Sequence, residues 1–487
     1  MFKNINCKNL PSLRRNIVYQ FLYELLIVFI PLFTILYVSR VLGAENIGLF
    51  SYTYAVANYF VLFANLGIKN YGSRTIAMVR NNKEELNRNF SEILSIHIIF
   101  SIIVIFVYLV LLFFFVEDNL VIFLIQSIYV FAAVFDINWF FFGIEKFKLT
   151  VGRNTLVKIL SVFLVLVFVK TQTDLWIYAL ILALSVFVGQ SVVWFALKQY
   201  VSWRRPSWAN MKQHIRPLFV LFLPILALSL YKYMDKIMLG SISSNVQVGF
   251  YENAEKIINV PMSLIMAFGV VLMPRIANMV TSKDKGEVFK LIDMSMEAVM
   301  LLAIAISFGL AGISFVLAPI FFGYEFEECG ILIMGLAVTV PFMAFANVIR
   351  TQYLIPYKED KIFVVSLFLG AAVNLIVNII LIPYMAARGA VIGTIFAEII
   401  VCIYQSYFVR KKIFIKKYLL NTIPPILIGI VMFVFVFQIG NVMNINIVTL
   451  ILQLVVGMFI YAVGVFLLML KSRTRLMVLL RKFVVRY

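Results

Sequence analysis

Apolar runs as long as a membrane-spanning helix follow one another along almost the whole chain, with short polar stretches between them. A helix needs roughly 20 apolar residues to cross about 30 Å of bilayer hydrocarbon. Only helices and closed barrels satisfy every backbone polar group in lipid, so the runs indicate an all-α integral membrane protein. The pattern predicts fourteen transmembrane helices, at 16–40, 47–68, 91–116, 120–143, 154–170, 175–197, 217–240, 250–274, 291–318, 330–355, 362–384, 389–409, 419–439 and 447–470.

Composition agrees with this pattern, since 63% of the residues are hydrophobic and only 13% are charged. Soluble domains hold roughly 25% charged residues, so no soluble domain is expected. The formal net charge is +19, and 36 of the 42 Lys and Arg residues fall in alternate polar segments, from 1–15 to 471–487. Under the positive-inside rule these segments and both termini are predicted to be cytoplasmic. The charge is therefore assigned to membrane orientation, and no nucleic-acid partner is expected.

An internal repeat divides the chain. "GLFSYTYAVANYF" from Gly48 matches "GFYENAEKIINVP" from Gly249, and "RTIAMV" from Arg74 matches "RIANMV" from Arg275, both at an offset of 201 residues. Six helices separate the copies, so both have the same orientation, as in transporters with two parallel lobes around a cavity. We predict an N-terminal lobe of helices 1–6 at 1–205, a C-terminal lobe of helices 7–12 at 206–412, and an appended helix pair with a basic tail at 413–487.

The chain carries no recognisable signature of nucleotide or peptide hydrolysis. GxxxxGK[ST], GxGxxG and HExxH are all absent, and the three cysteines stand far apart, in no metal or redox spacing. A transporter without a cofactor or a metal site is therefore expected. Its energy source must be something other than nucleotide hydrolysis by this chain, such as a proton or sodium gradient.

Charged residues inside the membrane cost roughly 2.5 to 3.5 kcal/mol each on insertion scales, so they are the first candidates for function. Lys232, Asp235 and Lys236 lie within about 100° of arc on one helical face, and Glu255 begins the next helix at the same level. Asp235 and Glu255 are interpreted as charge partners, with Asp235 holding the two lysines in place. The cluster fits either a purely structural set of ion pairs or a cavity that offers cations to an anionic substrate such as a diphosphate.

The remaining candidates fall into two groups. Substrate contacts are expected from the cationic residues Arg40, Lys232, Lys236, Lys256, Arg74 and Arg275, the last two at cytoplasmic helix ends. Buried carboxylates can bind a coupling proton or sodium ion, or can simply be neutral and hydrogen-bonded to a neighbouring helix. These carboxylates are Glu24, Asp136 and Glu398.

The segments "DKIMLGSISSNVQVGFYENAEKI" and "FANLGIKNYGSRTIAMVRNNKEE", with the fourteen-helix layout, resemble the polysaccharide biosynthesis or oligosaccharide flippase proteins. These are the Wzx-type members of the multidrug/oligosaccharidyl-lipid/polysaccharide exporter superfamily. The resemblance implies a multi-pass protein of the bacterial cytoplasmic membrane that moves an undecaprenyl-diphosphate-linked oligosaccharide to the outer leaflet. Capsule, exopolysaccharide or O-antigen would be the product, and the polymerase and chain-length machinery would be partners besides membrane lipids. The cationic cavity of the family corresponds to Arg40, Lys232, Lys236 and Lys256.

Four other functions compete with this expectation. A cation-coupled multidrug exporter of the same superfamily would favour a net acidic cavity, whereas the charges here are neutral to basic. A lipid II flippase shares the layout. A membrane-embedded polysaccharide polymerase would also span the membrane many times, but the longest predicted outer loop, around "PIFFGYEFEECG", is too short for an external catalytic domain. A scaffold for other sugar-assembly enzymes is the remaining alternative.

Overall fold

The computed structural model describes residues 10–281 and 285–471, and these form helices and short connections without a strand. The α-helices are α1 (Leu10–Asn65), α2 (Ile68–Val79), α3 (Lys83–Phe115), α4 (Leu120–Val134), α5 (Asn138–Gly143), α6 (Phe147–Phe168), α7 (Leu175–Leu197), α8 (Trp208–Ile242), α9 (Asn245–Thr281), α10 (Lys285–Phe322), α11 (Cys329–Ala337), α12 (Thr339–Ile349), α13 (Asp360–Val409), α14 (Ile415–Val442) and α15 (Ile447–Lys471). A short π-helical turn, Arg350–Leu354, follows α12.

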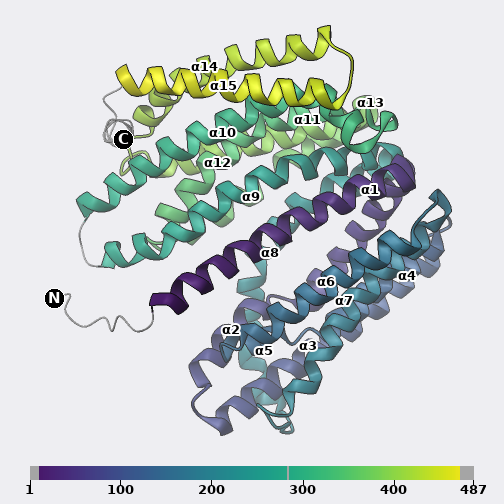
Figure 1. Ribbon diagram of the computed structural model, residues 1–487. Coiled ribbons are helices and arrows are strands. Elements are labelled where there is room, and N and C mark those ends of the chain that lie inside the picture. The colour runs from purple at the N-terminus through teal and green to yellow at the C-terminus, as the bar shows by residue number, and fades with distance from the viewer. Residues whose placement is uncertain (1–9, 282–284, 472–487) are drawn as a thin grey trace.

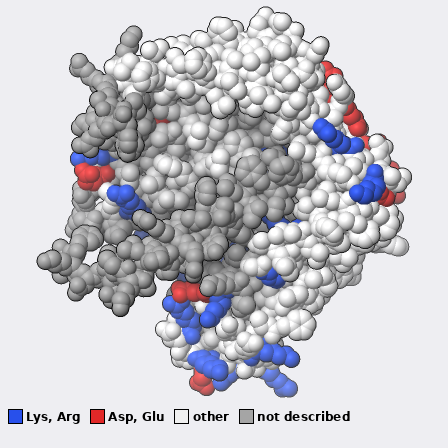
Figure 2. Space-filling model, viewed as in Figure 1, with Lys and Arg blue, Asp and Glu red and all other residues white. Residues whose placement is uncertain are grey.

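The helices form two groups, with α1 and α8 between them (Figure 1). One group holds α2 to α7, and the other holds α9 to α15. Many of the charged side chains visible in Figure 2 lie toward the two ends of the long helices, and the white surface of the described residues between those ends carries few charges. This distribution is the one expected for a bundle that crosses a bilayer.

Eleven helical stretches of the described residues are long and apolar enough to cross a membrane. Two of them, Thr34–Val79 and Asp360–Val409, each cover two predicted helices because the chain bends inside one long helix instead of forming a loop. The bends lie at Gly43, with φ 78°, and at Ala386, with φ 47°. The all-α membrane fold is confirmed, whereas the count of fourteen, the cytoplasmic termini and the lobe boundaries stay predictions.

Local sequence explains where several helices begin and break. Asn82 caps α3, because its side-chain oxygen accepts from the backbone N–H groups of Glu84 at 3.1 Å and Glu85 at 3.3 Å. The single helix predicted at 120–143 is divided into α4 and α5, and Asp136 at the break accepts from the backbone N–H of Asn138 at 3.0 Å. This contact satisfies a donor that the broken helix would leave free.

The two copies of the sequence repeat cross at two glycines. A Cβ at Gly48 would lie 1.6 Å from the backbone oxygen of Asn245, and a Cβ at Gly249 would lie 2.1 Å from that of Ala44. Residues 44 and 245, like 48 and 249, are 201 apart, so the contact is reciprocal between the copies. Only glycine permits this approach, which brings α1 directly against α9.

Candidate functional site

Four charged side chains form a partly buried ion-pair cluster between α8 and α9. Lys236 Nζ lies 2.5 Å from Glu252 Oε2 and 2.8 Å from Glu255 Oε2, and Lys256 Nζ lies 2.9 Å from Glu252 Oε1. The Lys236 side chain is only 8% exposed. Two lysines and two glutamates neutralise one another, which compensates much of the cost of removing them from water. The predicted partnership of Glu255 with a lysine is therefore present, and it is made with Lys236.

Asp235, next to this cluster in sequence, has entirely different partners. Its Oδ2 accepts from Tyr251 Oη at 2.6 Å and from Thr394 Oγ1 at 3.0 Å, and its Oδ1 accepts from Asn378 Nδ2 at 2.5 Å. In the described part of the chain Asp235 forms no ion pair with either lysine, so its expected role as their partner is wrong. Instead it joins α8 to α9 and to both arms of the bent α13.

The surroundings of Asp235 are rich in oxygen atoms. Asn378 Nδ2 also lies 3.2 Å from Asn374 Oδ1, while Asn378 Oδ1 is buried and has no hydrogen-bond partner among the residues that the structure describes. A Cβ at Gly393 would lie only 2.2 Å from Asn378 Oδ1, so a glycine leaves the room that this amide fills. A buried carboxylate among hydroxyl and amide oxygens is a chemically suitable environment for a small hard cation.

Lys232 differs from the other lysines of this region. It is exposed, and it forms no ion pair with a carboxylate among the described residues. Its Nζ lies 5.3 Å from the ring centroid of Tyr233, whose ring lies 6.0 Å from that of Tyr59 on α1. The Tyr59 hydroxyl donates to the backbone oxygen of Ser229 at 3.4 Å. A free cation and two tyrosines therefore lie together where α1 meets α8.

Arg40 is tied to the end of another helix. Its Nη2 donates to the backbone oxygen of Ile320 in the last turn of α10. Carbonyl groups in the last helical turn lack partners within the helix, and a guanidinium satisfies one of them. Arg40 is still exposed, so this contact leaves part of its donor capacity available.

The remaining predicted residues lie apart from the cluster. Arg74 lines a cavity between α2, α3 and α8, and Arg275 is exposed on α9. Asp136 caps the break before α5, with its Oδ1 also 2.7 Å from Asn138 Nδ2. Glu398 is buried on α13 and interacts with Arg350, and Glu24 lies outside the described side chains.

The sequence interpretation missed the residues that hold Asp235. Asn374 and Asn378 stand four residues apart in an apolar helix, a spacing that places both on one helical face. Polar pairs at this spacing inside a membrane helix were an available signal. The chain of contacts from Tyr71 through His214 to Glu92 was also missed, because its members come from three helices far apart in sequence.

A family model described as polysaccharide biosynthesis protein matches residues 13–280. The protein named "Putative O-antigen transporter" in Shigella dysenteriae is 24% identical over 408 residues, which cover 81% of this chain and 99% of that protein. The protein of the same name in Escherichia coli (strain K12) is 26% identical over 411 residues, covering 83% and 98%. The solved structure "Lipid II flippase MurJ, inward closed conformation" is 15% identical with a TM-score of 0.73, covering 92% of this chain and 98% of that one. The structural likeness shows a shared fold.

Proposed function

Because the chain belongs to the polysaccharide biosynthesis protein family, we propose that it is a flippase for polyprenyl-diphosphate-linked oligosaccharide repeat units. The relatives in Shigella dysenteriae and Escherichia coli are named as transporters and not as enzymes, which agrees with the class expected from the sequence. The direction that we propose is from the cytoplasmic to the outer leaflet, for capsule, exopolysaccharide or O-antigen synthesis. The polymerase and chain-length machinery that would receive the glycan are the partners that this proposal implies.

The observation that carries the proposal is the environment of Lys232. Lys236 and Lys256 are neutralised by glutamates, so they contribute little net charge toward a substrate. Lys232 has no carboxylate partner among the described residues where α1 meets α8, and a mobile ammonium group suits a diphosphate. Tyr59 and Tyr233 beside it offer flat apolar faces with polar tips, which suit sugar rings.

The lipid part of the substrate has different requirements. A polyprenyl tail can stay in hydrocarbon, whereas the diphosphate and the glycan need polar walls to cross it. An apolar cavity of about 960 Å³ lies between α10, α14 and α15, lined by residues such as Leu301, Met432 and Met458. Such a cavity offers a prenyl chain a place beside the C-terminal helices while the head group moves.

For the energy source we propose a cation bound at Asp235. Alternating access requires that one bound species favours one arrangement of the helices. Asp235 contacts both arms of α13 across the bend at Ala386, through Asn378 before it and Thr394 after it. A proton or a sodium ion at this carboxylate would change those contacts, and both ions stay candidates. Asp235→Asn is then expected to remove the dependence of transport on an ion gradient.

The proposal is tested by the leaflet location of a labelled polyprenyl-diphosphate-linked oligosaccharide in proteoliposomes, with and without a proton or sodium gradient. Wild-type protein is expected to expose the glycan on the far side, and Lys232→Gln to slow this by at least tenfold, about 1.4 kcal/mol of lost interaction. Lys158→Gln, which removes an exposed lysine on α6, is the matched control. Equal rates for both variants would remove Lys232 from the substrate path. Export of a cationic dye without movement of any glycan would favour a drug exporter. Movement of lipid II alone would favour a lipid II flippase.

A further inference from the structure

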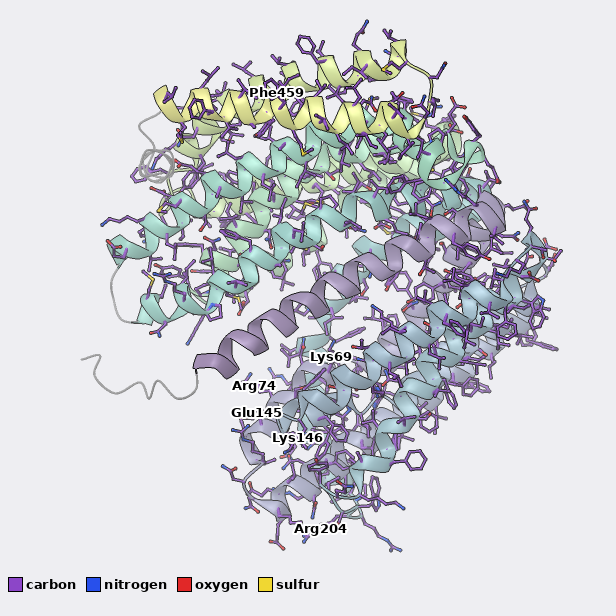
Figure 3. The ribbon with its side chains drawn as sticks, in the orientation of Figure 1. Lys69, Arg74, Glu145, Lys146, Arg204 and Phe459 are labelled. Carbon is purple, nitrogen blue, oxygen red and sulfur yellow. The ribbon has the colours of Figure 1, made fainter. Side chains whose placement is uncertain are left out.

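A cationic cavity lies away from Lys232, among helices of the N-terminal part. Its volume is about 580 Å³, and its walls come from α2, α3 and the first half of α8. Figure 3 labels Arg74 at this end of the molecule, and Lys69, Glu145 and Lys146 lie at the same end. Among the described residues that line the cavity there is no Asp or Glu.

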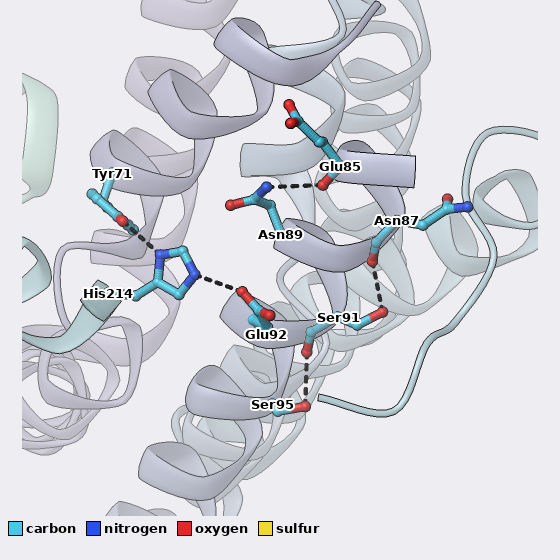
Figure 4. A network of polar contacts seen from close by, with 8 residues as sticks. All are labelled: Tyr71, Glu85, Asn87, Asn89, Ser91, Glu92, Ser95 and His214. Atoms are coloured by element: carbon cyan, nitrogen blue, oxygen red, sulfur yellow. Dashed lines mark hydrogen bonds and ion pairs between the residues drawn. The ribbon is translucent and has the colours of Figure 1, made fainter. Parts of the chain in front are cut away.

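One wall of the cavity is fixed by a chain of hydrogen bonds across three helices (Figure 4). Tyr71 Oη lies 2.6 Å from His214 Nδ1, and His214 Nε2 lies 2.9 Å from Glu92 Oε2. His214 and Glu92 are 2% and 1% exposed, so the carboxylate is sequestered behind the histidine. The carboxylate of Glu92 is thereby kept from the cavity, and α2, α3 and α8 are held together around it.

Two arginines on the cavity wall are left without a carboxylate partner in the described part of the chain. They are Arg74 on α2 and Arg88 on α3, and both are exposed. Neighbouring arginines are paired: Arg80 lies 2.6 Å from Glu145, and Arg204 lies 3.1 Å from Glu84. Carboxylates are therefore available at this end of the molecule, yet the two arginines that face the cavity do not use them.

The cavity wall combines these cations with apolar side chains. Asn89 and Gln213 add amide groups beside the arginines, while Met78 and Val220, also on the wall, are 69% and 57% exposed. In a membrane protein an exposed apolar surface is a surface for lipid chains. Two guanidinium groups with no competing carboxylate suit the oxygens of a phosphate group.

We propose that this cavity is a second site, separate from Lys232, that binds the phosphate group of a lipid whose chains lie along Met78 and Val220. The phosphate can belong to a polyprenyl diphosphate or to an anionic membrane lipid, and the chemistry of recognition is the same. The inference rests on the proposed function only in its choice of a polyprenyl diphosphate as one probe. The basic segments 69–90 and 198–216 predict a cytoplasmic location, where such a site would gather lipid head groups before transport.

Binding to the full-length protein in nanodiscs of zwitterionic lipid tests the proposal, with native mass spectrometry as the readout. The probes are undecaprenyl diphosphate, phosphatidylglycerol and inorganic diphosphate. Arg74→Gln with Arg88→Gln is expected to weaken binding of at least one of the two lipids by about tenfold for each arginine, as for lost charge-assisted hydrogen bonds. Arg205→Gln, which removes an exposed arginine outside the cavity, is expected to leave the affinity unchanged.

The outcomes separate the two possible lipids and the two proposals. Loss confined to undecaprenyl diphosphate identifies the substrate as the ligand, and loss for phosphatidylglycerol identifies a membrane lipid. The site is overturned if the double variant binds both lipids as tightly as wild type, or if Arg205→Gln weakens binding equally. It is also overturned if inorganic diphosphate binds as tightly as the lipids. Lys232→Gln is expected to bind the lipids as tightly as wild type does. The binding test is therefore valid even if the proposed flippase function is wrong. Thermal melting of the double variant within 2 °C of wild type excludes misfolding as the cause.

Discussion

The reciprocal crossing of α1 and α9 predicts that alanine at Gly48 destabilises the protein more than its size suggests. Its Cβ would lie 1.6 Å from the backbone oxygen of Asn245, where real Cβ atoms keep at least 3.0 Å, so the two helices must separate. Overpacking of this kind costs typically 1 to 3 kcal/mol, and the upper end applies because a backbone carbonyl cannot rotate away. The better helix propensity of alanine returns at most about 1 kcal/mol. The expected net loss is therefore about 2 kcal/mol.

The free energy of unfolding, measured by denaturant titration in detergent micelles, checks this value. Gly152→Ala on α6 is the matched control, because a Cβ there meets nothing within 4 Å. It is expected to be neutral or stabilising by up to about 1 kcal/mol. Gly249→Ala should destabilise as well, and the double variant by less than the sum, since one separation relieves both contacts. A Gly48→Ala protein as stable as Gly152→Ala would refute the reasoning.

Three further predictions concern other parts of the molecule. Glu252→Gln removes one carboxylate partner of Lys236 and the carboxylate partner of Lys256. The free energy of unfolding in the same titration is expected to fall by about 3 kcal/mol or more, as for broken buried ion pairs. Unchanged stability would show that water reaches the cluster. Asn82→Ala removes the cap of α3 and is expected to cost about 1 kcal/mol, seen as faster amide hydrogen exchange in the first turn of that helix; equal exchange rates would contradict it. Ala386→Gly relieves the backbone strain of a residue with φ 47° and ψ −126° at the bend of α13. Thermal melting is expected to show a protein more stable by about 1 kcal/mol. A less stable protein would show that the bend is not strained.

The helical membrane fold followed directly from the sequence, because apolar length alone requires it. Runs of roughly 20 apolar residues have no stable alternative to a helix in lipid. Sequence also placed Lys232, Asp235 and Lys236 on one face of α8, since 100° per residue fixes which side chains share a face. It placed Glu255 at their level, because α8 ends and α9 begins near residues 240–250. The repeat matches Gly48 with Gly249, but it does not indicate that the two glycines meet.

The details of the site depended on contacts between helices that no local pattern contains. Asp235 has one partner 143 residues away, Asn378, and another 159 residues away, Thr394. Its sequence neighbours Lys232 and Lys236 were the more obvious partners. Helices on every side offer similar apolar surfaces, so periodicity does not tell which of them packs against a given face.

Sequence by itself thus determined that the chain crosses a membrane as helices, and which charged residues lie within them, because transfer of the backbone and of charge into lipid depends on composition and local spacing. The tertiary structure alone decided which charges are neutralised and which stay free. Lys236 is paired with Glu252 and Glu255, while Lys232, one turn away, is exposed. Pairing requires atoms within about 3 Å, and only the packing of whole helices sets distances on that scale.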